Sequence, residues 1–336
     1  MSTQKNKGLF NLFIFIIVIL AVAGLINAKG GKFLTSVDKT STNQGGGDFT
    51  TDELISNIPN QKLIYAIKSS KSSDIYSYSF SDKKSKKIFT DSDESEKIRS
   101  IGPVDNDGKI LVYSGLVTNE FTGSLYLLNS DGSGKMEKIW NNFSSPQNPI
   151  ISPDGKSICY TLFSNAEKDF GFKLIISALD GQNKKQIFTD ATNIQAYAWS
   201  PNSNQIIYSY GENNNISKID ANSLNEDKLI NLNDQAINHL SWSLDNIIIA
   251  SLMPKGNDSF NQADIFTIDK STKKIISNTL LDDYPYYDDS NNLAYINTDY
   301  SIKQNDQYKI GKINVLLANG STEVIGDANQ IIGWSK

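Results

Sequence analysis

The sequence has little of the residues that build most catalytic and metal centres. Its 336 residues include one histidine, one cysteine and three methionines. A single cysteine excludes an internal disulfide and a cysteine-rich zinc site, so we expect Cys159, which lies in an apolar run, to be a small buried hydrophobe. The net charge of −5 argues against a nucleic-acid-binding protein, because such a protein needs a basic stripe.

Motifs of catalysis and of phosphate or calcium binding are lacking too. No Gly-x-Ser-x-Gly nucleophile elbow occurs, which excludes a peptidase domain of that type. Residues 129–136 suggest a phosphate loop only faintly, since the first glycine and the Ser or Thr after the lysine are missing. Residues 105–108 lack the later glutamate of a calcium-binding loop and are better explained as a turn.

One acidic cluster is a candidate for holding a hard cation. It consists of Asp282, Asp283, Asp288 and Asp289, with three tyrosines among them. Carboxylate oxygens are suitable ligands for such an ion. Two of the aspartates fall in a turn of the repeat described below, which favours a structural origin. We therefore predict no metal site and no cofactor.

An apolar run near the N-terminus is the first positive feature. Residues 9–26 have the length of a short membrane-spanning helix or of a long signal-peptide core. We predict a retained transmembrane helix over residues 9–27, after a cytoplasmic arm over residues 1–8, with the rest of the chain on the extracytoplasmic side of the cell membrane. The alternative is cleavage near Ala23 and secretion. Residues 28–52 are rich in Gly, Ser and Thr without hydrophobic periodicity and are predicted to be a flexible linker.

A repeat of 43 to 48 residues occupies residues 53–336. Its anchor position recurs at Asn57, Asp105, Ser152, Ser200, Ser243, Asp288 and Ser335. After each complete anchor come turn residues and then short apolar runs that are typical of β-strands. Four short antiparallel strands in about 47 residues correspond to one blade of a β-propeller.

The last anchor belongs to a seventh unit, which reads like the opening of the fourth and fifth. Residues 330–336 contain Trp334-Ser335, which matches Trp199-Ser200 and Trp242-Ser243 at the end of the first strand of those units. We therefore predict an all-β, six-bladed propeller in which this C-terminal strand closes the first blade as its innermost strand. The alternative for that position is residues 53–56, directly before the first anchor.

The repeat resembles a known family. The motif Trp-Ser-Pro-Asp-Gly-Lys-x-Ile-x-Tyr is the hallmark of TolB-type, WD-like propellers of bacterial exported proteins, and it occurs in variant form at residues 151–160 and 199–208. The resemblance implies the propeller fold over about residues 53–336. It implies little about function, because such repeats occur in translocation accessory proteins, in peptidase regulatory domains and elsewhere. We expect no counterpart of the additional N-terminal globular domain of TolB, so a TolB role is not carried over.

We expect the binding surface on the face that carries the long connections. In a four-stranded meander, the connections between second and third strands and between blades lie at the same end of every blade. Long loops on a rigid scaffold are frequent recognition sites. The alternative is that the acidic side chains of these connections are solvated and that their aromatic side chains pack on blade edges. The predicted binding residues are Phe121, Phe163, Phe170, Phe260, Asp282, Asp283, Tyr284 and Tyr300.

The sequence thus favours a monomeric, membrane-tethered propeller that binds a protein or peptide of the cell envelope. We expect it to be no enzyme and to bind no nucleic acid. The alternative is an enzyme centred on the propeller channel, such as a metal-assisted lyase or hydrolase acting on envelope sugar or peptide. The sole histidine, His239, lies on a predicted inner strand and could line that channel, although a lone histidine more often has a structural role.

Overall fold

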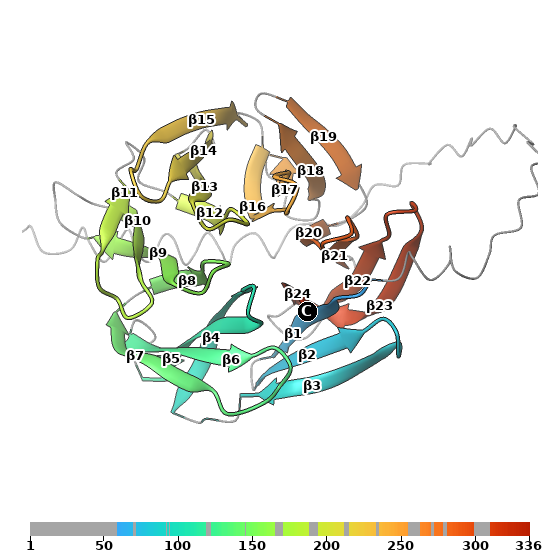
Figure 1. Ribbon diagram of the computed structural model, residues 1–336, viewed down its shortest axis with the longest axis horizontal. Helices are drawn as coiled ribbons and strands as arrows, with labels where there is room; N and C mark the ends of the chain where they lie inside the picture. The colour runs from blue at the N-terminus through green and yellow to red at the C-terminus, as the bar shows by residue number, and fades with distance from the viewer. Residues whose placement is uncertain are drawn as a thin grey trace, which may run out of the picture. The chain divides into compact units, whose positions relative to one another are not determined.

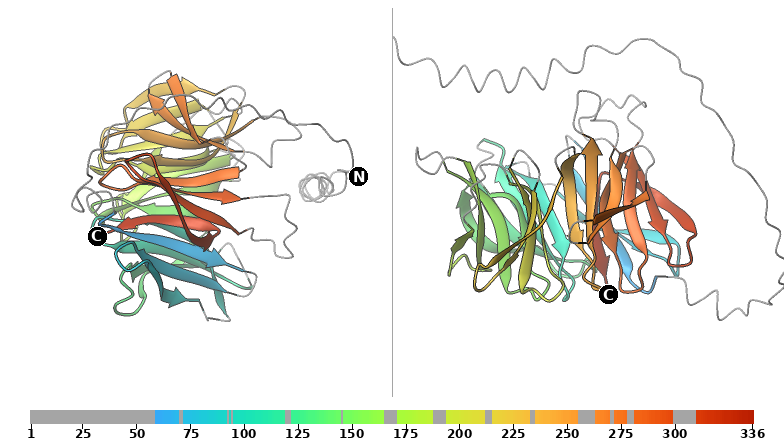
Figure 2. Two further views of the ribbon diagram at one scale, coloured as in Figure 1. Left: turned by 90° about the vertical axis from the view of Figure 1, so that its right-hand side faces the viewer. Right: turned by 90° about the horizontal axis from the view of Figure 1, so that it is seen from above.

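The computed structural model describes residues 59–69, 72–91, 93, 95–118, 122–144, 146–164, 171–187, 194–211, 215–232, 235–254, 263–269, 272–277, 281–298 and 310–336. These residues form 24 β-strands and no helix, in six four-stranded antiparallel sheets around a common axis (Figures 1 and 2). The prediction of an all-β, six-bladed propeller is confirmed. The predicted helix over residues 9–27, the linker over residues 28–52 and the anchor Asn57 lie outside the described residues. Within the described ranges, no helix is long and apolar enough to span a membrane.

Each of the first three blades is a meander that runs from the axis outwards. Blade 1 contains, beginning with its innermost strand, β24 (Gln330–Ser335), β1 (Lys62–Lys68), β2 (Ser73–Ser79) and β3 (Lys84–Thr90). Blade 2 contains β4 (Glu96–Val104), β5 (Lys109–Leu116), β6 (Thr122–Asn129) and β7 (Glu137–Ser144). Blade 3 contains β8 (Pro146–Ile151), β9 (Ser157–Ser164), β10 (Gly171–Ala178) and β11 (Lys185–Ile187).

The other three blades have the same order. Blade 4 contains β12 (Ile194–Trp199), β13 (Gln205–Tyr210), β14 (Asn215–Asp220) and β15 (Glu226–Asn231). Blade 5 contains β16 (Gln235–Trp242), β17 (Ile248–Pro254), β18 (Asp264–Asp269) and β19 (Thr272–Ser277). Blade 6 contains β20 (Leu281–Tyr287), β21 (Leu293–Thr298), β22 (Gly311–Leu316) and β23 (Thr322–Ala328).

Burial along the strands follows from the way blades stack. A blade covers both of its faces with its neighbours, so its inner strands carry apolar side chains on both sides. In β1, Leu63, Ile64, Tyr65 and Ala66 are all buried. The outermost strands have one free edge, and the lysine-rich residues 84–87 of β3 are exposed. Charged side chains at such an edge oppose pairing with another chain.

β24 closes the ring as the innermost strand of blade 1. It pairs antiparallel with β1, and Trp334 lies opposite Leu63. The Trp334 indole stacks on Phe80 with 5.6 Å between ring centroids, and its Nε1–H donates to the carbonyl oxygen of Tyr286 at 2.9 Å. The predicted C-terminal closure is confirmed. Residues 53–56, the alternative for this position, lie outside the described residues.

The repeat anchor is a buried hydrogen-bond acceptor that shapes the first turn of a blade. At five anchors, a side-chain oxygen accepts the backbone N–H at or next to the start of the following strand, at 2.7 to 3.1 Å. The pairs are Asp105 with Lys109, Ser152 with Ser157, Ser200 with Gln205, Ser243 with Ile247 and Asp288 with Asn292. Only a short side chain with an oxygen acceptor satisfies this amide, which explains why Ser and Asp recur at the anchor.

Candidate binding cavity on the propeller axis

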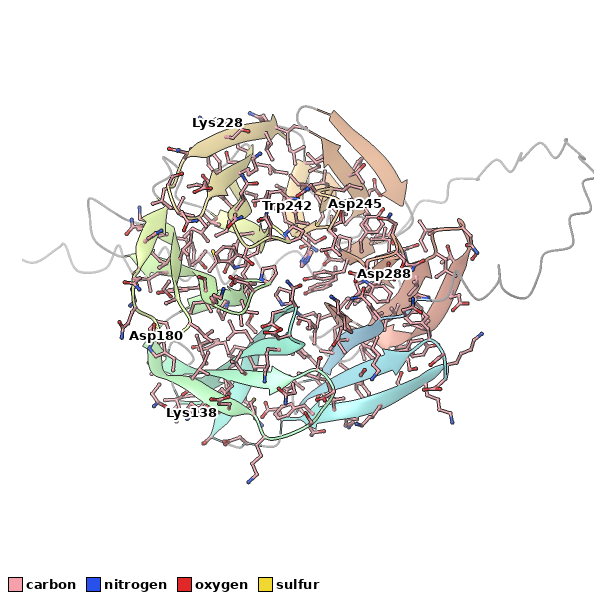
Figure 3. The ribbon with its side chains drawn as sticks, in the orientation of Figure 1. Lys138, Asp180, Lys228, Trp242, Asp245 and Asp288 are labelled. Atoms are coloured by element: carbon pink, nitrogen blue, oxygen red, sulfur yellow. The ribbon has the colours of Figure 1, made fainter. Side chains whose placement is uncertain are left out.

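The six innermost strands surround the propeller axis (Figure 1) and enclose a cavity of about 680 Å³. Figure 3 shows the side chains around it. Where these strands end, the cavity is lined by the residues that follow the anchors: Asn106, Pro153, Pro201, Leu244, Asp289 and Lys336. Where the strands start, its lining is more polar, and we call this end the start mouth. The start mouth is formed by Lys68, Arg99, Asn148, Asn238, Asp283 and Gln330. The volume is that of a typical ligand site.

All six inner strands break their pairing register with the next strand of the blade. The breaks are of the kind made by a β-bulge, with one more residue on the inner strand than on its partner. A bulge bends a strand and turns a side chain in a new direction, and bulges are frequent beside functional sites. The residues at the breaks that line the cavity are Arg99, Asn148, Ala196, Asn238, Tyr284 and Ile332, together with Pro103 at a second break of β4.

Blades 5 and 6 contribute an aromatic cluster around the sole histidine. The ring of His239 on β16 lies 5.1 Å from that of Tyr284 and 5.2 Å from that of Tyr286, between centroids, and its Nε2 is 3.1 Å from the Tyr286 hydroxyl. Burial lowers the pKa of His239 to about 4, because the imidazolium loses its hydration. Burial, aided by the charge of Asp283, raises the pKa of Tyr286. Both groups are therefore neutral at pH 7.

Asp283 brings a carboxyl group into the same part of the cavity. Its Oδ1 accepts the backbone N–H of Tyr284 at 2.8 Å, and its Oδ2 accepts the side-chain amide of Asn238. Burial raises the pKa of Asp283 to about 7, despite the hydrogen bond from the Tyr284 N–H, which favours the ionised form. Tyr284 has φ of +53°, an uncommon value for a bulky residue, which the surrounding packing must hold in place.

Two cations complete the start mouth. Lys68 is the last residue of β1, and Arg99 lies at the register break of β4 and is exposed. Burial lowers the pKa of Lys68 to about 8. Neither residue is among the predicted binding residues. The sequence does contain a signal for one of them, because Arg99 is its only arginine.

The predicted binding residues have different outcomes. Asp282, Asp283 and Tyr284 lie within β20, the innermost strand of blade 6, so their predicted place in a connection between blades is wrong. Alternation along β20 divides the two acids: Asp283 lines the cavity, whereas Asp282 is fully buried and accepts the Asn297 side-chain amide at 2.7 Å. Asp282 is therefore not part of an exposed surface. The side chain of Phe163 and all of Phe121, Phe170, Phe260 and Tyr300 lie outside the described part of the chain.

The predicted acidic cluster does not form one site. Asp288 accepts the backbone N–H of Asn292 in the first turn of its blade. Asp289 lines the end of the cavity opposite the start mouth, and Asp282 is fully buried. Among the described residues, no three His, Cys, Asp or Glu side chains are grouped so that they could hold a metal ion. Cys159 is fully buried with a raised pKa, as expected for a small buried hydrophobe.

Comparisons with known proteins identify the fold. No family model and no curated protein matches the chain. TolB from Acinetobacter baumannii is similar with a TM-score of 0.61 and 17% identity, over 83% of this chain and 68% of that chain. A putative TolB from Agrobacterium tumefaciens is similar with a TM-score of 0.58 and 15% identity, over 81% of this chain and 94% of that chain. A chain of a nidogen/laminin complex has a TM-score of 0.56 and 13% identity, over 82% of this chain and 98% of that chain. The structure is thus a six-bladed propeller similar to those of the TolB proteins.

Proposed function

We propose that this chain is a membrane-tethered, extracytoplasmic propeller that binds a peptide, or an extended segment of a protein, in its axial cavity and carries out no catalysis. The observation that carries the proposal is the cavity itself, which is lined from all six blades by aromatic, polar and charged side chains. Aromatic side chains provide large contact areas, and a few polar groups fix orientation. One of the similar chains, from the nidogen/laminin complex, was crystallised in a protein–protein complex.

A peptide-display selection on the full-length chain tests this proposal. Ala198 lines the cavity on β12, so Ala198→Trp would occupy part of the ligand volume. Lys228→Trp adds the same indole to the exposed outer strand β15 and is the matched control (Figure 3). We expect peptides enriched on the wild type to bind the control equally and the cavity variant at least ten-fold more weakly. Equal binding to both variants would contradict the proposal.

The membrane tether is a separate part of the proposal and rests on the apolar residues 9–26. Retention predicts that the chain stays with the membrane fraction after alkaline carbonate washing and keeps its original N-terminus. Protease added to cells whose outer layers have been removed and whose cell membrane is intact should digest the propeller. A soluble chain that begins after Ala23 would instead support secretion.

A second candidate function, a channel-centred enzyme, is favoured by one observation. Asp283, His239 and Tyr286 lie together in the cavity, and the pKa of Asp283 is near 7. Titratable groups with shifted pKa values in a cavity are candidates for acid–base catalysis. Mass spectrometry of bound peptides or envelope glycans after incubation separates the two functions. A ligand that is altered by the wild type and left intact by Asp283→Asn would favour the enzyme.

A further inference from the structure

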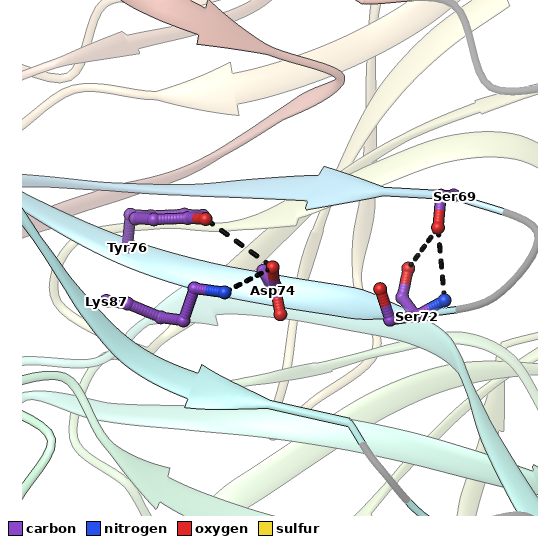
Figure 4. Close-up of polar contacts among 5 residues, drawn as sticks. All are labelled: Ser69, Ser72, Asp74, Tyr76 and Lys87. Carbon is purple, nitrogen blue, oxygen red and sulfur yellow. Dashed lines mark hydrogen bonds and ion pairs between the residues drawn. The ribbon is translucent and has the colours of Figure 1, made fainter.

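The start mouth contains two cations that are presented by a rigid framework. Lys68 is held on both sides by one side chain, because its N–H donates to Asn329 Oδ1 and its carbonyl accepts Asn329 Nδ2–H at 3.2 Å. Directly after Lys68, hydrogen bonds join Ser69 to Ser72 (Figure 4). The position of Lys68 is therefore set by the backbone.

Arg99 is fixed relative to Lys68 where the ring closes. β24 lies between β1 and β4, and the side-chain amide of Gln330 on β24 donates to the carbonyl oxygen of Ile101 on β4 at 2.8 Å. This bond ties blade 2 to the closing strand of blade 1. Lys68 and Arg99 thus reach the same mouth of one cavity from adjacent blades.

Neither cation has a counter-charge in the part of the chain that the structure describes. Other lysines are paired: Lys87 Nζ lies 2.6 Å from Asp74 Oδ2 (Figure 4), and Lys312 Nζ lies 2.6 Å from Asp327 Oδ1. The carboxylate at the start mouth, Asp283, is engaged by an amide side chain and a backbone N–H. Partial loss of hydration without a neighbouring anion is unfavourable for an ammonium group, and the lowered pKa of Lys68 reflects this cost.

The second cation, Arg99, is an arginine and not a lysine, which indicates what kind of anion it binds. Among 32 basic residues of the Lys and Arg types, only residue 99 is arginine. A guanidinium presents a planar fork of donors that matches the two oxygens of a carboxylate, which an ammonium does not. At a site that needs only positive charge, lysine would serve equally well.

We propose that Lys68 and Arg99 form a carboxylate-binding subsite at the start mouth, and that the bound peptide places a C-terminal carboxylate or an acidic side chain there. This inference rests on the proposed peptide-binding function. A single carboxylate fits the local charge better than a dianionic phosphate, because the carboxyl group of Asp283, with a pKa of about 7, lies at the same mouth and carries part of a negative charge at neutral pH. The adjacent Tyr284 and Tyr286 rings provide an apolar wall for the rest of the peptide.

Four pools of fluorescein-labelled hexapeptides test the subsite on the full-length chain by anisotropy. All are random mixtures of Ala, Ser, Tyr and Leu; one is amidated, one has a free C-terminus, one is amidated with a single Glu, and one is amidated with a single phosphoserine. We expect the free-terminus or the Glu pool to bind about 10- to 100-fold more tightly than the amidated pool, and the preferred one identifies the source of the carboxylate. A preference for phosphoserine would overturn the carboxylate assignment.

Variants identify the residues that recognise the carboxylate. Arg99→Gln and Lys68→Gln should each remove most of the preference, and Arg99→Lys should restore only part of it because the charge returns without the fork. Lys228→Gln, which removes a charge on the outer strand β15, should behave as the wild type. A carboxylate preference that survives in the Arg99→Gln, Lys68→Gln double variant would overturn the inference.

The same measurements separate this inference from the proposed function. If Ala198→Trp abolishes binding of every pool but no carboxylate preference exists, the cavity binds peptides and the subsite assignment is wrong. If no pool binds the wild type more tightly than Ala198→Trp, the proposed function fails and the subsite with it. Circular dichroism of each variant shows that the propeller is folded.

Discussion

His239 and Asp283 lie on adjacent inner strands, and burial shifts their titrations in opposite senses. The folded pKa of Asp283, about 7, is above its unfolded value of about 4, so its contribution to stability is lost as the pH rises towards 7. The folded pKa of His239, about 4, is below its unfolded value of about 6.5, so its contribution is lost as the pH falls towards 4. Between pH 4 and 6.5, the contribution of Asp283 to the free energy of unfolding therefore decreases with pH while that of His239 increases.

Single substitutions should therefore reveal a pH dependence of the free energy of unfolding that largely cancels in the wild type. Relative to the wild type, the free energy of unfolding of Asp283→Asn should increase with pH between 4.5 and 6.5, by up to about 1 kcal/mol per pH unit, because only the His239 term remains. His239→Gln should show the reverse trend. Urea denaturation at three pH values measures both. Parallel curves for all three proteins would contradict the folded pKa values of this pair.

The anchor residues offer a test of local hydrogen bonding. Ser200→Ala removes the buried hydroxyl that accepts the backbone N–H of Gln205, which should reduce the free energy of unfolding by about 1 to 3 kcal/mol. Ser290→Ala changes an exposed serine in an equivalent turn and should alter stability by less than about 0.5 kcal/mol. Chemical denaturation of both variants gives the comparison. Equal stabilities would mean that water or backbone replaces the anchor oxygen.

Residue placement in the cavity could be predicted only in part. The sequence identifies Asp283 and Tyr284 as binding candidates but assigns them to a connection, because Pro285 and the register break interrupt strand alternation there. A bulge adds a residue without a characteristic side chain, so the orientation of Arg99 or Asn238 cannot be derived from periodicity. The rarity of arginine is a readable signal for Arg99, whereas nothing in the sequence distinguishes Lys68 from other lysines.

At the scale of elements, the repeat predicts the blades well because its turns and strands are each encoded locally. Residues 153–156 and 201–204 form turns before short apolar strands, as their composition indicates. The pairing of β24 with β1 is predictable only from the number of anchors, since no local feature of either strand identifies the strand with which it pairs. Phe163 shows the limit of the approach, because the predicted loop position lies inside β9.

Removal of residues 330–336 should prevent stable folding. Without β24, blade 1 has no innermost strand, the inner edge of β1 is unpaired, and the stacking of Phe80 on Trp334 is lost. We expect aggregation, or a melting temperature lower by more than about 10 °C. A full-length chain with Trp334→Phe is the control and should retain the fold with a smaller loss of stability. A truncated chain that melts like the full-length protein would show that the ring closes without β24.

For the molecule as a whole, the ring predicts cooperative unfolding. Trp140, Trp199, Trp242 and Trp334 report on blades 2, 4, 5 and 1. In a closed ring each blade is covered by two neighbours, so the loss of one blade exposes the faces of both. Variants with one tryptophan each should unfold at the same urea midpoint as the backbone signal of the same variant. A midpoint that differs between fluorescence and circular dichroism would indicate that a blade unfolds separately.

The pairing of β1 with β24 also determines when folding can finish. β1 is synthesised early, yet the strand that covers its inner edge follows roughly 270 residues later. At about 5 to 20 residues per second this interval lasts roughly 15 to 50 s, during which an apolar strand edge is open to other chains. The nascent chain is therefore most prone to aggregate before its last strand arrives, and a chaperone that shields β1 during this interval would raise the yield of folded protein most.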